Sequence, residues 1–287
     1  MTVKPRPRLD ALAGCSLALS ISDSEDLAPL GLLPVHLQLA LAELARIVFV
    51  GGARLLYAGD MRAGGHTELL HGELERYAAA KGSLTVCLAW SVHRRTPLAA
   101  LEAFNQALGV RGELLALDST GTPLADWRTD RPAGGIDDLH SDAKAAAYEG
   151  MRQHLSGIED ARIAVAGRRG DGRTLPGVLH EVQISLARKH PGYLVGGFGG
   201  TVLDMAAAIE PAIDGLRAPT AARPGAAAQA ALDLLRQQAT EAGGWALLAN
   251  GLDADENLRL AGTHRPSELA ALVAIGLARL AGASTEG

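Results

Sequence analysis

The order of glycines and apolar residues at 193–209, YLVGGFGGTVLDMAAAI, decides the fold of this chain. An apolar burst stops at Gly196 and Gly197, and apolar residues resume after Gly200 with helical spacing. This pattern predicts a buried strand, a tight turn and the N-terminus of a helix. Backbone N–H groups at such a junction can face an anion. The alternative is that the glycines only let the strand and the helix pack closely.

Apolar bursts and helix-like stretches alternate as far as residue 209. The other bursts span 15–21, 53–59, 83–90, 113–118 and 161–167, and the expected helices span 34–50, 67–81, 97–108, 141–156 and 177–190. Short bursts that are apolar on both faces are typical of parallel strands covered by helices. The sequence therefore predicts an α/β fold with a doubly wound, mainly parallel sheet.

Only helices are expected in the C-terminal part of the chain. Alanine- and leucine-rich stretches at 224–239, 253–262 and 265–282 have helical character, and Asp253 and Glu256 have the spacing of a capping box. No linker is long enough to require a second domain. We expect one domain over 11–287, with a helical extension from about 224 and a flexible N-terminus at 1–10.

The charge and the cysteine content argue against several classes of protein. Lys and Arg number 27 against 32 acidic residues, a net charge of −5, which disfavours a nucleic-acid partner. No apolar stretch reaches the roughly 18 residues of a membrane helix, and no signal-peptide core is visible. Cys15 and Cys87 lie in apolar runs, as packed thiols of a reducing compartment do. We expect a cytoplasmic protein with no cofactor and, without Cys-x-x-Cys or His-x-x-x-His spacings, no metal site.

Polar and glycine-rich loops follow four of the expected strands. In a doubly wound sheet, ligands bind beyond the carboxyl ends of the strands, so these loops would share one edge. Their hydroxyls, amides and arginines suit a phosphorylated ligand with ribose hydroxyls. The predicted ligand contacts are Ser20, Ser22 and Ser24; Gly59, Asp60, Arg62, Gly64, Gly65 and Thr67; Arg168 and Arg173; Glu181; and Gly196, Gly197, Phe198, Gly199, Gly200 and Thr201.

These residues also have purely structural interpretations. The serines are common turn residues, and Asp60 can close the turn after its strand. Residues 168–173 can form a solvated basic loop, which we expect for Arg169 in particular. Glu181 would lie in the first turns of a helix, where an acid favours the macrodipole in any case.

Common glycine signatures of enzymes are absent from the sequence. The dinucleotide fingerprint G-x-G-x-x-G would need a glycine at Val202 and should follow the first strand, whereas this loop follows the last. The chain contains neither G-x-x-x-x-G-K-[ST] nor a G-x-S-x-G nucleophile elbow. These absences disfavour a hydride-transfer dehydrogenase and a nucleoside triphosphatase.

Five segments together resemble a prokaryotic branch of the SLOG superfamily. They are SISDSEDLAPLGL at 20–32, LLYAGDMRAGGHTELL at 55–70, PGVLHEVQ at 176–183, YLVGGFGG at 193–200 and NGLDADENLRLA at 250–261. This superfamily includes the LOG phosphoribohydrolases, the DNA-processing Smf proteins and the sensor region of TRPM channels. The resemblance spans roughly 11–280. It implies a Rossmann-like fold that binds nucleotides or nucleotide-derived ligands, such as ADP-ribose-like products of NAD, often in bacterial conflict systems.

The catalytic motif of the LOG enzymes is altered in this chain. That motif, P-G-G-x-G-T-x-x-E, supplies a glutamate that works with an arginine to break an N-glycosidic bond. Here the proline is missing, an extra glycine precedes Thr201, and the acid is the shorter Asp204. Because a carboxylate that stabilises an oxocarbenium-like centre must be placed accurately, these changes favour binding over hydrolysis.

We therefore expect a sensor of a nucleotide-derived small molecule, in a bacterial conflict or defence system. Its signal would pass through an effector protein partner or a change in a homo-oligomer. The alternative is a LOG-type nucleotide N-glycosidase or phosphoribohydrolase, which would use Asp204, Asp60 or Glu181 as its acidic group. We also expect a methyl group at Gly199 to block the ligand before it harms the fold.

Overall fold

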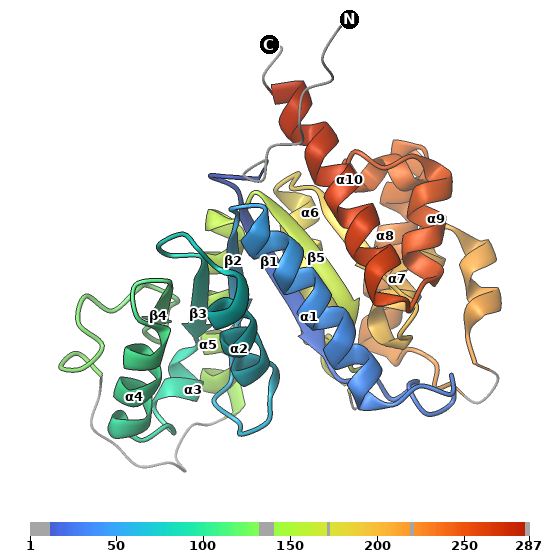
Figure 1. Ribbon diagram of the computed structural model, residues 1–287. Helices are drawn as coiled ribbons and strands as arrows, with labels where there is room; N and C mark the ends of the chain where they lie inside the picture. Colours follow the sequence, from blue (N-terminus) through green and yellow to red (C-terminus); the bar gives the residue numbers. More distant parts are fainter. Residues whose placement is uncertain (1–11, 132–140, 171–172, 219–220, 285–287) are drawn as a thin grey trace, which may run out of the picture.

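A six-stranded parallel sheet forms the centre of the protein. The computed structural model describes residues 12–131, 141–170, 173–218 and 221–284, and the expected flexible N-terminus at 1–10 lies outside them (Figure 1). Within these residues the strand order is β4-β3-β2-β1-β5-β6, all parallel. The strands are Ser16–Ser22 (β1), Arg54–Ala58 (β2), Leu84–Leu88 (β3), Gly112–Ala116 (β4), Ala161–Ala166 (β5) and Gly192–Val195 (β6). The predicted doubly wound α/β fold is confirmed.

Helices cover both faces of the sheet. One face carries α1 (Pro34–Val50), α2 (His66–Tyr77) and α10 (Pro266–Ser284), and the other carries α5 (Ser141–Ile158), α6 (Gly177–Ala187) and α7 (Gly200–Ile209) (Figure 1). Because side chains alternate along a strand, neighbouring residues serve different faces. Ile163 packs in the cluster that contains the leucines of α1, whereas Ala164 packs with Leu179 of α6.

The C-terminal helices are integrated into the core. The remaining elements are α3 (Trp90–His93), α4 (Leu98–Leu108), η1 (Pro211–Leu216), α8 (Ala226–Ala242), η2 (Gly244–Leu248) and α9 (Ala254–Gly262). In Figure 1, α10 lies beside α1, and its Leu269 and Val273 are fully buried in the main cluster. The capping box of Asp253 and Glu256 is confirmed. The 3₁₀ helices η1 and η2 were not predicted, because segments of 6 and 5 residues carry too little periodicity.

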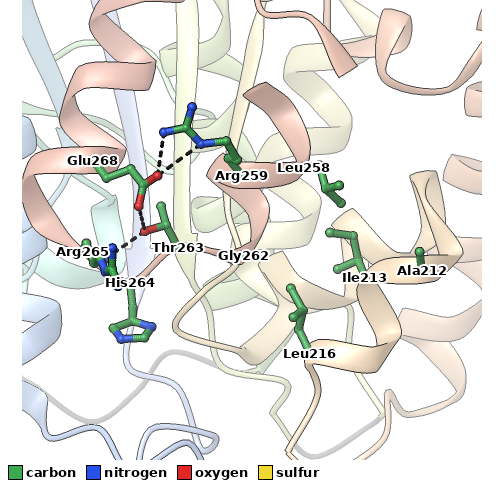
Figure 2. Close-up of a pocket in the computed structure, with 10 residues that line it drawn as sticks. All are labelled: Ala212, Ile213, Leu216, Leu258, Arg259, Gly262, Thr263, His264, Arg265 and Glu268. Atoms are coloured by element: carbon green, nitrogen blue, oxygen red, sulfur yellow. Dashed lines mark hydrogen bonds and ion pairs between the residues drawn. The ribbon is translucent and has the colours of Figure 1, made fainter. Parts of the chain in front are cut away.

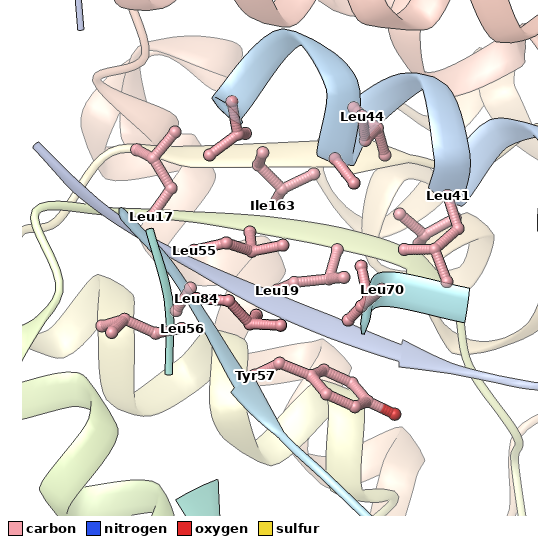
Figure 3. Packing of buried hydrophobic residues seen from close by; sticks show 14 of the residues in the cluster. Leu17, Leu19, Leu41, Leu44, Leu55, Leu56, Tyr57, Leu70, Leu84 and Ile163 are labelled. Atoms are coloured by element: carbon pink, nitrogen blue, oxygen red, sulfur yellow. The ribbon is translucent and has the colours of Figure 1, made fainter. Parts of the chain in front are cut away.

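A layer of leucines joins α1 to the sheet (Figure 3). Leu41 and Leu44 of α1 pack in one cluster with Leu17 and Leu19 of β1 and with Leu55 of β2, and none of the five is more than 2% exposed. Burial of one leucine side chain contributes roughly 1.5–3 kcal/mol. This layer therefore fixes α1 against β1 and β2.

The sequence predicted that both cysteines are packed thiols and that no segment forms a membrane helix. Both cysteines are free thiols; Cys87 is buried in β3 and Cys15 is half-buried before β1. In the part of the chain that the structure describes, no helix has the combination of length and apolarity that crossing a membrane requires.

Candidate functional site

The winding of the sheet changes direction between β1 and β5. The connection after β1 leads through α1 to β2 on one side, and the connection after β5 leads through α6 to β6 on the other. Doubly wound sheets bind ligands beyond the carboxyl ends of two such strands. We use the name switch-point site for the polar residues gathered there, which are Ser20, Ser22, Asp23, Tyr57, Asp60, Arg62, His66, Arg168 and Glu181.

Three of the four predicted loops meet at Asp23. Its carboxylate lies 3.3 Å from the guanidinium of Arg168 and 3.9 Å from Nε2 of His66. The hydroxyl of Ser22 accepts a hydrogen bond of 2.8 Å from the backbone N–H of Arg168. A pocket of about 140 Å³ is lined by Asp23, Arg62, His66 and their neighbours. The loops after β1, β2 and β5 therefore form one continuous polar surface.

The loop after β2 combines exposed charges with structural contacts. Nε of Arg62 donates a hydrogen bond of 2.5 Å to the carboxylate of Asp60, and these side chains are 67% and 36% exposed.

Other residues of this loop make structural contacts. The hydroxyl of Thr67 donates a hydrogen bond to the backbone carbonyl of Asp60, and the amide of Gly64 donates one to the carboxylate of Glu68. A methyl group at Gly59 would lie 2.6 Å from Val86. The glycine and the threonine thus shape the loop that presents Arg62.

Glu181 of α6 belongs to a buried polar cluster next to β1. The hydroxyl of Ser20 donates to Oε2 of Glu181 at 2.5 Å and accepts from Nη1 of Arg162 at 2.7 Å. Arg162 is 2% exposed and also pairs with Glu159. Nε of Arg152 lies 3.9 Å from Oε1 of Glu181 and has no hydrogen-bond partner within the described residues. The structure thus brings Ser20 and Glu181 together, with two arginines beside them.

Tyr57 is a site residue that the sequence analysis missed. It is 5% exposed, and Figure 3 shows its hydroxyl directed away from the leucine layer. Burial raises the pKa of its phenol, and the charges of Asp60, Glu181 and Asp23 raise that pKa further, against the effect of Arg62. The phenol therefore keeps its proton, and among the described residues it has no hydrogen-bond partner. The sequence did place Tyr57 directly before Ala58 and Gly59, near the carboxyl end of an expected strand, and this position could have indicated a site residue.

The glycine turn at 196–200 is tightly packed. A methyl group at Gly196 would lie 2.5 Å from the carbonyl oxygen of Ala261, and one at Gly197 would lie 2.1 Å from that of Thr263. The amide of Gly199 donates to the carbonyl of Gly196 at 2.8 Å. The packing interpretation of these glycines therefore has direct support.

Protein acceptors also occupy the amides at the start of α7. The amide of Gly200 donates to the carboxylate of Asp26 at 2.8 Å, and the amide of Thr201 donates to the carbonyl of Gly167 at 2.9 Å. Asp26 is 1% exposed. An anion does lie at this helix N-terminus, and it is a side chain of the protein itself.

Arg169 is buried, so the prediction that it is solvated is wrong. It is 4% exposed, and it donates to Asp204 at 2.7 and 3.0 Å and to Asp26 at 2.8 Å. Arg217 also pairs with Asp204. Burial alone would raise the pKa of Asp26, but hydrogen bonds from Arg169 and Gly200, together with the charges of Arg169 and Arg217, hold that pKa below its usual value. Neither acidic partner is near Arg169 in the sequence, which is why the sequence did not reveal the cluster.

Several other predicted contacts have structural roles. The hydroxyl of Ser24 accepts from the amide of Asp26 at 3.1 Å, which is a turn contact. Phe198 is fully buried, Gly65 is the N-cap residue of α2, and Arg173 is exposed in the loop before α6. Ligand contacts of these residues stay a prediction.

Gly199 does not tolerate the methyl group that we expected it to accept. Its φ is +71°, and a methyl group there would lie 2.4 Å from Cβ of Asp26. The expectation that such a change leaves the fold unharmed is therefore wrong, because it assumed a compatible backbone conformation and free space.

Comparison with known proteins places the chain in a family. Searches of curated proteins and of solved structures found no significant match. The sequence model of the family described as SLOG cluster2 matches residues 11–260. This range includes all six strands and the residues of the switch-point site. The chain therefore belongs to the SLOG cluster2 family, which confirms the resemblance to the SLOG superfamily.

Proposed function

We propose that this protein binds a nucleotide-derived small molecule of the ADP-ribose type at the switch-point site and acts as its sensor. Membership of the SLOG family supports a nucleotide-related ligand. The position of the site, beyond the carboxyl ends of β1 and β5, supports the location.

The observation that carries this proposal is the hydroxyl of Tyr57. The ring of Tyr57 is held in place by burial, and its hydroxyl has no hydrogen-bond partner among the described residues, so a ligand acceptor could take its hydrogen bond without displacing a protein group. Burial, and after it the acids nearby, raise the pKa of this phenol, so it remains a hydrogen-bond donor. Those acids, Asp60, Glu181 and Asp23, are in turn acceptors for the hydroxyl groups of a ribose.

The phosphates of the ligand are proposed to bind at Arg62 and Arg168. Their side chains are 67% and 60% exposed, and each donates one side-chain hydrogen bond to an acid in the described residues. A guanidinium has five N–H donors, so both retain donors for a phosphate. Asp26 already occupies the anion position at Gly200, which favours these arginines over the glycine turn.

The burial of Asp204 favours a sensor over a hydrolase. Its side chain is 2% exposed and is held by Arg169 and Arg217, so its use as a catalytic group would require these ion pairs to break. Glu181, with a side chain that is 12% exposed, remains as the acid of the alternative function. The free thiols support a reducing, cytoplasmic setting, and a role in defence rests on the resemblance alone.

The proposal is tested with ADP-ribose, NAD and AMP in thermal-shift and calorimetric titrations. Binding to the folded state alone raises stability by about 2.7 kcal/mol at a hundredfold excess over Kd. Tyr57→Phe should weaken ADP-ribose binding while the melting temperature of the free protein stays the same or rises.

Tyr193→Phe is the matched control for this test. The ring of Tyr193 is buried like that of Tyr57, but its hydroxyl donates to the carbonyl of Asn250 at 2.8 Å. Its loss should lower the melting temperature and leave the ligand-induced shift intact. If none of the three compounds binds, or if both variants bind like the wild type, the proposed site is wrong.

A further inference from the structure

A second pocket lies between η1 and the connection from α9 to α10 (Figure 2). Its volume is about 560 Å³, which is in the range of small-molecule sites. It shares no lining residue with the switch-point site. The proposed function does not use it.

One wall of this pocket is apolar. Ile213 and Leu216 come from η1, and Leu258 comes from α9. Figure 2 shows these three side chains together on one side of the pocket. Leu216 is 48% exposed and Leu258 is 42% exposed, although most leucines of this protein are buried. An apolar group that covered them would gain roughly 25 cal/mol per Å² of apolar surface removed from water.

The opposite wall is polar and already organised. Glu268 accepts a hydrogen bond of 2.7 Å from Arg259 and one of 2.8 Å from the hydroxyl of Thr263. The same hydroxyl accepts from the amide of Arg265 at 3.2 Å. Figure 2 shows this chain of contacts. Because Arg259 and Glu268 form an ion pair, neither residue needs an oppositely charged group on a ligand to neutralise it.

Arg265 supplies the excess charge of the pocket. It is exposed, and within the described residues its guanidinium makes no hydrogen bond and no ion pair. With Arg259, Arg265 and Glu268 in its lining, the pocket therefore carries one more positive than negative charge, beside an apolar wall. A complementary ligand has an apolar body and one anionic group.

We propose that this pocket is a second binding site, which takes a small amphipathic anion. The apolar body of the ligand lies against Leu216 and Leu258, and its carboxylate, sulfonate or phosphate group lies at Arg265. This assignment is independent of the proposed function, because no residue is common to the two sites.

The test uses anilinonaphthalenesulfonate, a fluorescent amphipathic anion, and its uncharged analogue phenylnaphthylamine. The full chain should bind the sulfonate saturably, with one molecule per chain. Leu216→Asp should weaken binding by about tenfold or more, because it places a charge against the apolar body. Leu234→Asp is the matched control, because Leu234 is also 48% exposed but lies on α8 outside the pocket. It should bind like the wild type.

The charge of the ligand is tested separately. Arg265→Gln should weaken binding of the sulfonate by up to about fivefold, the limit for an exposed ion pair, and leave binding of phenylnaphthylamine unchanged. Lys144→Gln, which removes an exposed cation outside the pocket, should affect neither probe.

Three results would overturn the assignment. The first is equal binding by the Leu216 and Leu234 variants, and the second is an equal loss of both probes in Arg265→Gln. The third is loss of sulfonate binding as the chain self-associates, which would mean that a second copy covers the pocket. If Leu216→Asp fails to fold, Leu258→Asp serves in its place, with the same expected loss.

Discussion

The carboxylate of Asp26 caps the N-terminus of α7 by accepting a hydrogen bond of 2.8 Å from the backbone N–H of Gly200. The two residues are 174 positions apart in the sequence. The same carboxylate pairs with Arg169, which in turn holds Asp204 inside α7. The loops after β1 and β5 are thereby joined to the glycine turn through one buried set of charges.

Asp26→Asn should destabilise the fold by about 1.5–3 kcal/mol, the usual contribution of a hydrogen bond to a charged group. The loss is limited because Arg169 keeps its pair with Asp204. Chemical denaturation measures the change. Asp233→Asn is the control, because Asp233 pairs with Arg236 on the exposed face of α8. A control as destabilised as Asp26→Asn would contradict the role given to Asp26.

The contribution of Asp26 to stability should disappear in acid. Its pKa is lower in the folded chain than in the unfolded chain, where it is about 3.9. The stabilisation is therefore complete above about pH 4 and is lost as the pH falls through the folded-state pKa. The free energy of unfolding, measured from pH 7 downward, should fall more steeply for the wild type than for Asp26→Asn. Parallel curves would show that Asp26 does not carry this pH dependence.

Gly199→Ala should unfold the protein more readily than Gly64→Ala. Both glycines have positive φ values, +71° and +68°. A methyl group at Gly199 would lie 2.4 Å from Cβ of Asp26, whereas no atom lies within 4 Å of one at Gly64. Backbone strain alone costs about 1–2 kcal/mol, so Gly64→Ala should lose about that much and Gly199→Ala clearly more. Equal melting temperatures would mean that the turn relaxes around the added methyl group.

Arg62→Gln should weaken binding of ADP-ribose by about two- to fivefold, with the larger effect at low salt. Arg76→Gln is a close control. The two arginines are 67% and 68% exposed, and each pairs with a neighbouring acid at 2.5 Å. Arg76 lies near the C-terminus of α2, away from the switch-point site. Calorimetric titration at two salt concentrations measures the difference, and equal affinities would remove the arginine from the proposed site.

Incubation with AMP or NAD should leave the N-glycosidic bond intact. Asp204, which the resemblance to the LOG motif matches with the catalytic glutamate, is held by Arg169 and Arg217. Chromatography of free adenine and nicotinamide measures the outcome. Release over many turnovers that persists in Asp204→Asn and disappears in Glu181→Gln would establish the hydrolase function instead.

The sequence by itself determined the elements, their order and the family. The periodicity of apolar residues indicates strands and helices locally. The six apolar segments that form the strands, and the long helices, could therefore be located from neighbouring residues alone. The shared edge of the polar loops followed as well, because parallel strands joined by helices all end on one side.

Only the tertiary structure decided what the polar residues do. Whether Arg169 is solvated depends on Asp26 and Asp204, which lie 143 and 35 positions away, and no local pattern reports such partners. The same holds for the hydroxyl of Tyr57, whose acidic surroundings come from the loops after β1 and β2 and from helix α6. The glycine turn suggested an anion at the start of α7, and the fold supplied that anion from β1's own loop, because burial there leaves no water to satisfy the amide of Gly200.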